Sequence, residues 1–241
     1  MNVEVCSSSI ESVIIANSAG ADRIELCSGL SVGGLSPSKG LIELALKKSK
    51  IPIHCLIRPR EGHFIYNKND FETILYDVRY MKKMGVTGIV VGMINEDHDI
   101  NSEQLNEVIK EASGIEITFH RAFDCLKDPK KNILKLSSMG VSRILTSGGS
   151  KSAIKGINNL IKWKLLSNNL IEIQPGGGIN LKNIMNFKDA GFSSIHLSGT
   201  INSIWNQSYP KNIDKTFYDQ KIRIPSYEII KKIVNLAKYP M

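Results

Sequence analysis

Cys6 and Cys27 are the residues of this 241-residue chain best suited to hold a soft metal ion. Each stands at the end of a short run of residues typical of a buried strand, and soft ions prefer thiolate ligands. Neighbouring strands lie about 4.8 Å apart, so thiols at the ends of adjacent strands can meet. The alternative is that both are buried, reduced cysteines, which are among the most buried residue types. Cys55 alternates with isoleucines and is expected in the core, and Cys125 is a weaker candidate ligand.

Glu25, His120 and Asp124 have the chemistry of an acid/base site. Glu25 and His120 are the candidates for proton transfer, and Asp124 would orient a partner or pair with Arg121. Arg58 is a further catalytic candidate, because its guanidinium can stabilise a developing negative charge. The alternative for Glu25 and Arg58 is a buried ion pair that closes the structure.

Two arginines and two glycine-containing turns suggest a site for a small anion. Arg58 and Arg60 can each clamp a carboxylate or phosphate through two hydrogen bonds. Two turns are expected to leave backbone N–H groups free to bind an anion. The first contains Gly176, Gly177 and Gly178 and is followed by a predicted helix N-terminus, and the second contains Ser198 and Gly199. Because tight turns also need glycine, either turn alone is weak evidence.

These residues occupy regular places in an alternation of strand-like and helix-like segments. Eight apolar, β-branched runs predict strands over residues 3–6, 23–27, 53–58, 88–92, 115–120, 143–146, 171–174 and 194–198. Helices are predicted over residues 9–19, 69–84, 101–112, 128–139, 150–166 and 180–188. Cap signals support several of them: a Ser-Ser-Ile-Glu capping box opens the first, and Asn69 and Pro129 open two others.

Strands that alternate with helices at about 30 residues per unit predict a closed (β/α)8 barrel, the TIM-barrel fold. The rival open, doubly wound sheet usually carries a glycine fingerprint after its first strand, whereas this chain has Cys-Ser-Ser-Ser there. We expect residues 1–200 to form the barrel of a single domain. Residues 201–241 are expected to be an irregular C-terminal extension, containing Trp205, Tyr209 and Phe217 and a final helix near 227–237, that packs on the barrel or on a partner subunit.

The barrel interior is predicted to be unusually polar. Side chains of a barrel strand face the helices and the interior alternately. Arg23, Glu172 and Glu4 lie toward strand starts, where we expect a structural network because buried charges need partners. His54 and His196 also point inward and are interpreted as satisfied core histidines. The interior residues toward the strand ends, where barrel active sites lie, are Cys6, Glu25, Cys27, Arg58, His120, Gln174 and Ser198.

Several long motifs at the strand ends resemble the CutC family, named for copper homeostasis. They are GADRIELCSGLSVGGLSPSKG (20–40), IRPREGHFIY (57–66), TFHRAFD (118–124), RILTSGG (143–149) and QPGGGIN (174–180). The resemblance runs from residue 3 to about residue 200 and implies a TIM barrel, a cytoplasmic location, a homodimer or higher homo-oligomer, and a role in handling Cu(I). It points to Cys6 and Cys27 as the thiol ligands, and it implies no agreed enzymatic reaction.

Composition and charge exclude several other classes of protein. The apolar fraction of 42% and charged fraction of 22% are those of an ordinary soluble globule, and we expect no membrane association. Four cysteines make no secreted disulfide framework. The whole net charge of +8 falls in residues 151–241, which hold 13 Lys/Arg and 5 Asp/Glu. Because no nucleic-acid motif accompanies this excess, we expect it to be a solvated surface or to attract a small anionic ligand.

The sequence therefore predicts a copper-homeostasis protein that binds Cu(I) through thiols at the C-terminal face of the barrel, without an organic cofactor. The alternative is a metal-independent acid/base enzyme, an isomerase or lyase, acting on a small phosphorylated or carboxylated metabolite at the same face. A Schiff-base aldolase is disfavoured because no predicted strand contains a lysine. The absence of a His-x-His pair disfavours a hydrolase with a His-built metal centre.

Overall fold

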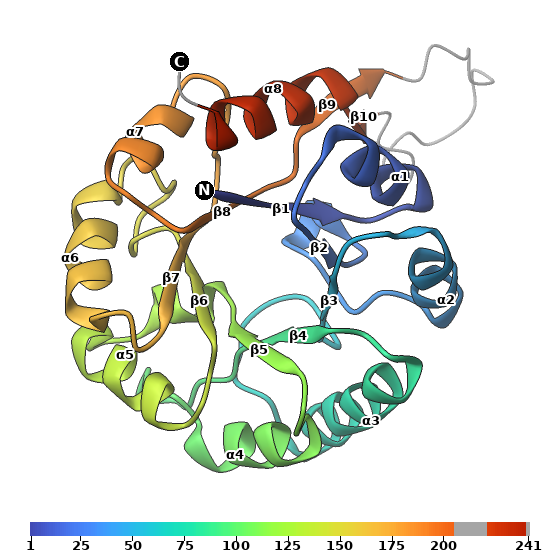
Figure 1. Cartoon of the computed structure of the whole chain (residues 1–241). Helices are drawn as coiled ribbons and strands as arrows, with labels where there is room; N and C mark the ends of the chain where they lie inside the picture. Colours follow the sequence, from blue (N-terminus) through green and yellow to red (C-terminus); the bar gives the residue numbers. More distant parts are fainter. Residues whose placement is uncertain (205–220, 240–241) are drawn as a thin grey trace, which may run out of the picture.

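The computed structural model describes residues 1–204 and 221–239 and shows a nearly closed barrel of parallel strands (Figure 1). Eight strands form one sheet in the order β7-β6-β5-β4-β3-β2-β1-β8. Each predicted run overlaps one of them, and β1 and β7 extend beyond the predicted ends: β1 (Asn2–Ser7), β2 (Arg23–Leu26), β3 (Ile53–Leu56), β4 (Gly88–Val91), β5 (Glu116–Phe119), β6 (Arg143–Thr146), β7 (Glu172–Pro175) and β8 (Ser194–Leu197). The predicted (β/α)8 barrel is confirmed.

The barrel closes between β7 and β8 by a single bridge, from Gly176 to His196. A Cβ on Gly176 would lie 2.4 Å from the Cδ1 atom of Leu145, so a larger residue here would force the Leu145 side chain to shift. Below the bridge, Glu172 accepts hydrogen bonds from the hydroxyls of Ser193 and Ser194. Side chains thus complete the junction where the backbone ladder is weakest.

Helices surround the sheet in one layer (Figure 1). They are α1 (Ile10–Ala19), α2 (Lys39–Lys48), α3 (Lys68–Met84), α4 (Ser102–Glu111), α5 (Pro129–Ser138), α6 (Ile157–Ser167), α7 (Ile184–Asp189) and α8 (Tyr227–Lys238). The sequence analysis did not predict α2, whose buried side chains are only Ile42 and Ala45. Two buried positions form too narrow an apolar face to give a clear helical periodicity in the sequence.

Local hydrogen bonding places several helix starts differently from the prediction. The capping box of α1 joins Ser9 to Ser12, not to the glutamate of Ser-Ser-Ile-Glu. Asn67 rather than Asn69 caps α3. The two helices predicted over 150–166 and 180–188 begin only at Ile157 and Ile184. The glycine turn after β7 is therefore separated from the start of α7, and no helix N-terminus follows it directly.

The last helix belongs to the barrel. α8 lies between α7 and α1 (Figure 1), contacts both helices and β1, and buries Ile230, Ile233 and Val234. α8 thus occupies the helical position that follows β8 around the barrel. The connection contains an antiparallel pair, β9 (Thr200–Ile204) with β10 (Lys221–Pro225), that was not predicted. Trp205, Tyr209 and Phe217 lie outside the described residues.

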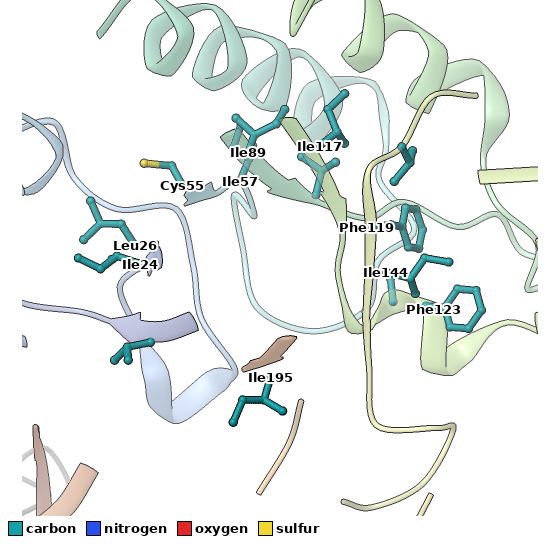
Figure 2. Close-up of a cluster of buried hydrophobic side chains, with 14 of the residues drawn as sticks. Ile24, Leu26, Cys55, Ile57, Ile89, Ile117, Phe119, Phe123, Ile144 and Ile195 are labelled. Atoms are coloured by element: carbon teal, nitrogen blue, oxygen red, sulfur yellow. The ribbon is translucent and has the colours of Figure 1, made fainter. Parts of the chain in front are cut away.

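A layer of buried apolar side chains joins the outer face of the strands to the helices (Figure 2). Ile24, Leu26, Cys55 and Ile57 all lie in this layer and are at most 1% exposed. Burying a side chain of this size stabilises the fold by about 1.5–3 kcal/mol. The predicted core position of Cys55 is confirmed. No described helix is long and apolar enough to cross a membrane.

Charged residues at the strand starts pair inside the barrel, as expected. Arg23 pairs with Glu4. Arg143 pairs with Glu172 at 2.6 Å and with Glu116 at 3.3 Å. These pairs offset the cost of placing charge in the barrel interior. Above them, toward the strand ends, lies the cavity described next.

Candidate functional site

One cavity of about 440 Å³ opens at the carboxyl ends of the barrel strands. Its polar side chains come from β1, β2, β3, β5, β8 and the segments that follow them: Cys6, Glu25, Arg58, His120, Arg121, Asp124, Cys125, His196 and Ser198. Its apolar wall includes Leu30, Val32, Leu56, Phe64, Leu145, Ile179 and Leu197. This is the face at which active sites of TIM barrels lie.

Cys6 and Cys27 meet at the bottom of this cavity. Their sulfur atoms are 3.5 Å apart, and both pack with Leu56 and Val90 in a small apolar cluster inside the barrel. Cys6 lines the cavity, whereas Cys27 is fully buried behind it. The hydrogen bond to Cys27, together with burial, holds the pKa of the Cys6 thiol well above its usual range.

Glu25 and His196 lie beside Cys6 and continue the cluster. Pairing of β1 with β2 sets Glu25 opposite Cys6, and pairing of β1 with β8 sets His196 opposite Glu4. His196 Nδ1 lies 2.8 Å from Glu4 and its Nε2 lies 3.5 Å from Glu25. One ligand atom each from Cys6, Glu25 and His196 lies within 4.8 Å of the other two. The strand register thus assembles sulfur, carboxylate and imidazole at one point.

Burial and charge act in opposite directions in this cluster. Burial raises the pKa of Glu25. Burial alone would lower the pKa of His196, but the carboxylates of Glu25 and Glu4 outweigh it and the pKa is raised. Burial would likewise raise the pKa of Glu4, yet the hydrogen bond with His196 and the charge of Arg23 hold it well below its usual range. Glu4 and His196 therefore form a charge-assisted pair.

Arg58 is buried and its guanidinium bonds mainly to the backbone. Nη1 donates to the carbonyls of Val32 and Gly34, and Nη2 donates to that of Gly62, at 2.8–2.9 Å. The group also lies 5.1 Å from the centre of the Phe64 ring. Among the described residues no ion pair joins Arg58 to Glu25, so the alternative of a closing ion pair is wrong. Of the Arg58 nitrogen atoms, Nε is buried and has no hydrogen-bond partner among the described residues.

His120 is a buried, neutral imidazole in the wall formed by β5. Its Nδ1 accepts a hydrogen bond from the backbone N–H of Ala122 at 3.1 Å, which leaves the proton on Nε2. Burial and the charge of Arg58 lower the pKa of His120 to about 3. Nε2 is buried and has no partner among the described residues, and the ring lies 4.8 Å from that of Phe64. At neutral pH this histidine can donate a hydrogen bond, but it is a weak base.

Asp124 lines the cavity but its oxygens are occupied. It pairs with Arg121 at 2.9 Å, as the sequence suggested, and accepts hydrogen bonds from Thr146, Ser147 and Gly149. These bonds tie the turn after β5 to the turn after β6. The geometry favours a structural rather than a proton-transfer role.

The predicted anion-binding residues are only partly brought together. Gly177, Gly178 and Ser198 line the cavity. Gly176 and Gly199 do not line it, because they pack against Leu145 and Ile230 respectively. Arg60 also lies outside: it pairs with Asp70 at 2.8 Å and donates to three carbonyls of its own loop.

His196 is the member of the cluster that the sequence analysis did not choose. Strand alternation placed it inside the barrel, and it stands one residue from the end of β8. To predict its contact with Glu25, one must know which strand pairs with β8 when the barrel closes; that strand is β1. That neighbour relation is the signal that identifies it.

Comparisons with known proteins agree with this architecture. The model of the CutC family matches residues 1–201. A CutC protein of Pasteurella multocida is 37% identical over 99% of this chain and 100% of its own length. One of Pectobacterium atrosepticum is 41% identical over 81% of this chain and 77% of its own.

Solved structures give the same result. The crystal structure of a CutC protein from Streptococcus agalactiae, assigned provisionally to copper homeostasis, is 30% identical with a TM-score of 0.78, covering 82% of this chain and 98% of that one. An aldolase named QR15 has a TM-score of 0.62 at 15% identity, covering 82% of this chain and 89% of that one, and shows the barrel fold alone. The chain belongs to the CutC family.

Proposed function

We propose that this protein binds Cu(I) through Cys6 and Cys27 as part of copper homeostasis. The observation that carries the proposal is the 3.5 Å separation of the sulfur atoms of the cavity-lining Cys6 and the buried Cys27. Metal–thiolate bonds of about 2.3 Å, the value for zinc, give a straight sulfur–metal–sulfur span of about 4.6 Å. A movement of about 1 Å therefore converts the hydrogen-bonded thiols into a two-coordinate site.

The surroundings of the two thiols favour a soft monovalent ion. Leu56 and Val90 pack against both cysteines, and Cys27 is fully buried. Two thiolates and one Cu(I) leave a single negative charge, which costs less in a buried site than two free thiolates. Binding releases the thiol protons, so copper affinity should rise with pH.

An anaerobic competition with a chromophoric Cu(I) chelator tests the proposal. We expect Cys6→Ser and Cys27→Ser each to lose most of the affinity, and the double variant to lose it fully. Cys125→Ser is the matched control, because this cysteine lines the same cavity away from the pair. Unchanged affinity in the double variant would refute the proposal.

The proposal includes a cytoplasmic location and a homodimer or larger homo-oligomer. Reduced, adjacent thiols persist in a reducing compartment. Light scattering of the purified chain measures the oligomeric state, and fractionation of cells measures the location; a monomer or a secreted protein would contradict these two parts.

A second candidate is an acid/base enzyme, an isomerase or lyase, that acts on a small phosphorylated or carboxylated metabolite. It is favoured by two buried donors in the cavity wall, Arg58 Nε and His120 Nε2, that have no partner among the described residues. Phe64 lies against both side chains, so a ligand reaches them when this ring rotates. An anionic group there would satisfy both donors.

Thermal shifts with phosphate and with small carboxylates test this second function. Anions should stabilise the wild-type protein, and His120→Gln should weaken their apparent affinity at least about tenfold, since a hydrogen bond to a charged group contributes about 1.5–3 kcal/mol. Arg60→Lys, outside the cavity, should leave the shift unchanged. If no anion stabilises the wild-type protein, the cavity wall is not an anion site.

A further inference from the structure

We propose that Cys6, Glu25 and His196 form a site for a divalent metal ion of the zinc class, with one coordination position open to the cavity. The site shares Cys6 with the proposed Cu(I) pair but does not use Cys27, so the two proposals can fail separately. It rests on the placement of three different ligand types by three adjacent strands, β2, β1 and β8.

The three ligand atoms already have nearly the spacing that a metal requires. A tetrahedral ion with bonds of about 2.0–2.3 Å needs ligand atoms about 3.3–3.8 Å apart. His196 Nε2 and Glu25 Oε2 are 3.5 Å apart, and all three atoms lie within 4.8 Å of one another. Side-chain adjustments of about 1 Å close the site around an ion.

Neighbouring groups hold two of the ligands in binding orientation. Glu4 lies 2.8 Å from His196 Nδ1 and is itself paired with Arg23. A carboxylate that accepts from one imidazole nitrogen directs the other toward a metal, as in many zinc sites. The thiol of Cys27, 3.5 Å from Cys6, can donate a hydrogen bond to the Cys6 sulfur. The ligands thus have the supporting contacts that a built metal site shows.

Charge favours a divalent ion at this place. Metal ligands bind in their deprotonated forms, so one thiolate, one carboxylate and a neutral imidazole bring two negative charges. Cys6 and Glu25 are 8% and 5% exposed, and an unbalanced charge so deeply buried is costly. A divalent ion makes the site neutral, whereas a monovalent ion leaves one charge.

The fourth position would face the cavity. Cys6, Glu25 and His196 all line it, so a water molecule or a group of a small ligand can complete the coordination. Three protein ligands with one open position are typical of catalytic rather than structural zinc sites.

Co(II) is the spectroscopic probe for this site. Titration of the reduced full-length protein with Co(II) should give the intense visible bands of a tetrahedral ion and a thiolate-to-cobalt charge-transfer band. Zn(II) should displace them at one equivalent. Absence of both bands in the wild-type protein would overturn the proposal, and this result does not depend on how any variant folds.

Variants identify the ligands. We expect Glu25→Gln and His196→Gln each to weaken Zn(II) binding at least about 100-fold, and Glu4→Gln, acting through His196, to weaken it about 10- to 100-fold. Cys125→Ser is the control and should keep the Co(II) spectrum. Loss of the charge-transfer band in Cys27→Ser but not in Cys6→Ser would refute the assignment.

Measurements with Cu(I) separate this proposal from the proposed function. His196→Gln should lose Zn(II) affinity and keep Cu(I) affinity. Cys27→Ser should lose Cu(I) affinity and keep Zn(II) affinity. If Cu(I) binding fails in the wild-type protein while the Co(II) spectrum appears, the divalent site stands alone. If His196→Gln retains wild-type Zn(II) affinity, the divalent site is wrong whatever the result with copper.

Discussion

Arg58→Met is the substitution that best separates a structural from a ligand-binding role of this arginine. Arg58 is 6% exposed and donates to the carbonyls of Val32, Gly34 and Gly62. Methionine fills a similar volume but donates to none of them. Three backbone carbonyls then lose their side-chain partner around the cavity rim.

The structure sets the size of the effect. Hydrogen bonds to a charged group contribute about 1.5–3 kcal/mol each, but removal of a buried cation returns part of its desolvation cost. At about 1 kcal/mol net for each of the three bonds, the free energy of unfolding should fall by about 3 kcal/mol. For a chain of this size that lowers Tm by about 6–12 °C.

Urea unfolding followed by circular dichroism measures the loss. Arg79→Met is the control, because Arg79 is half-exposed and its ion pair with Glu111 is a surface pair that should contribute little to stability. If Arg58→Met costs no more than Arg79→Met, the loops do not depend on Arg58. Its guanidinium would then be free to bind a ligand, and its structural role would be refuted.

Three further substitutions or conditions test other parts of the molecule. Gly176→Ala should cost about 1–3 kcal/mol by overpacking, whereas Gly40→Ala, with no atom within 4 Å of the added Cβ, should be neutral or stabilising; equal Tm values would contradict the close packing at the β7–β8 junction. Burial lowers the pKa of His54 to about 4 and that of His120 to about 3, so below about pH 6.5 the unfolded chain binds more protons at these two sites, which should cost about 4 kcal/mol of stability from pH 7 to pH 5; the raised pKa values of His196 and Glu25 oppose part of this loss, and a constant urea midpoint over that range argues against neutral buried histidines. Asp124→Asn should lower the free energy of unfolding by about 2 kcal/mol and leave metal affinity unchanged; a selective loss of metal binding would assign Asp124 to the metal site instead.

Strand positions were predictable because they depend on local pattern. The predicted run at residues 23–27 contains β2 (Arg23–Leu26), since the alternating apolar residues Ile24 and Leu26 indicate both the strand and its helix-facing side. Helix starts were less predictable. The stretch before α6 is irregular and packs closely against the turn after β6. A Cβ added to Gly156 would lie only 2.0 Å from the carbonyl oxygen of Ser147. That contact joins two loops and has no signature in either segment alone.

The composition of the site was also easier to predict than its connections. Alternation and position along each strand placed Cys6, Glu25 and His120 at the correct end of the barrel. Arg58 donates to backbone carbonyls. Because every residue has a carbonyl, these partners could not be identified from residue types in the sequence. His196 looked like a core histidine because its significance comes from two carboxylates on other strands.

The cavity combines two chemically different walls, and their order around the barrel explains how both proposals fit one space. β8, β1 and β2 are adjacent and supply His196, Cys6 and Glu25, the metal-binding side. β3 and β5 supply the segments that carry Arg58 and His120, whose unpartnered donors suit an anionic group. A ligand in a cavity of about 440 Å³ can occupy an open metal position and reach the opposite donors at once. Metal and anion should therefore increase each other's affinity if they bind together, because coupling between two ligands is reciprocal.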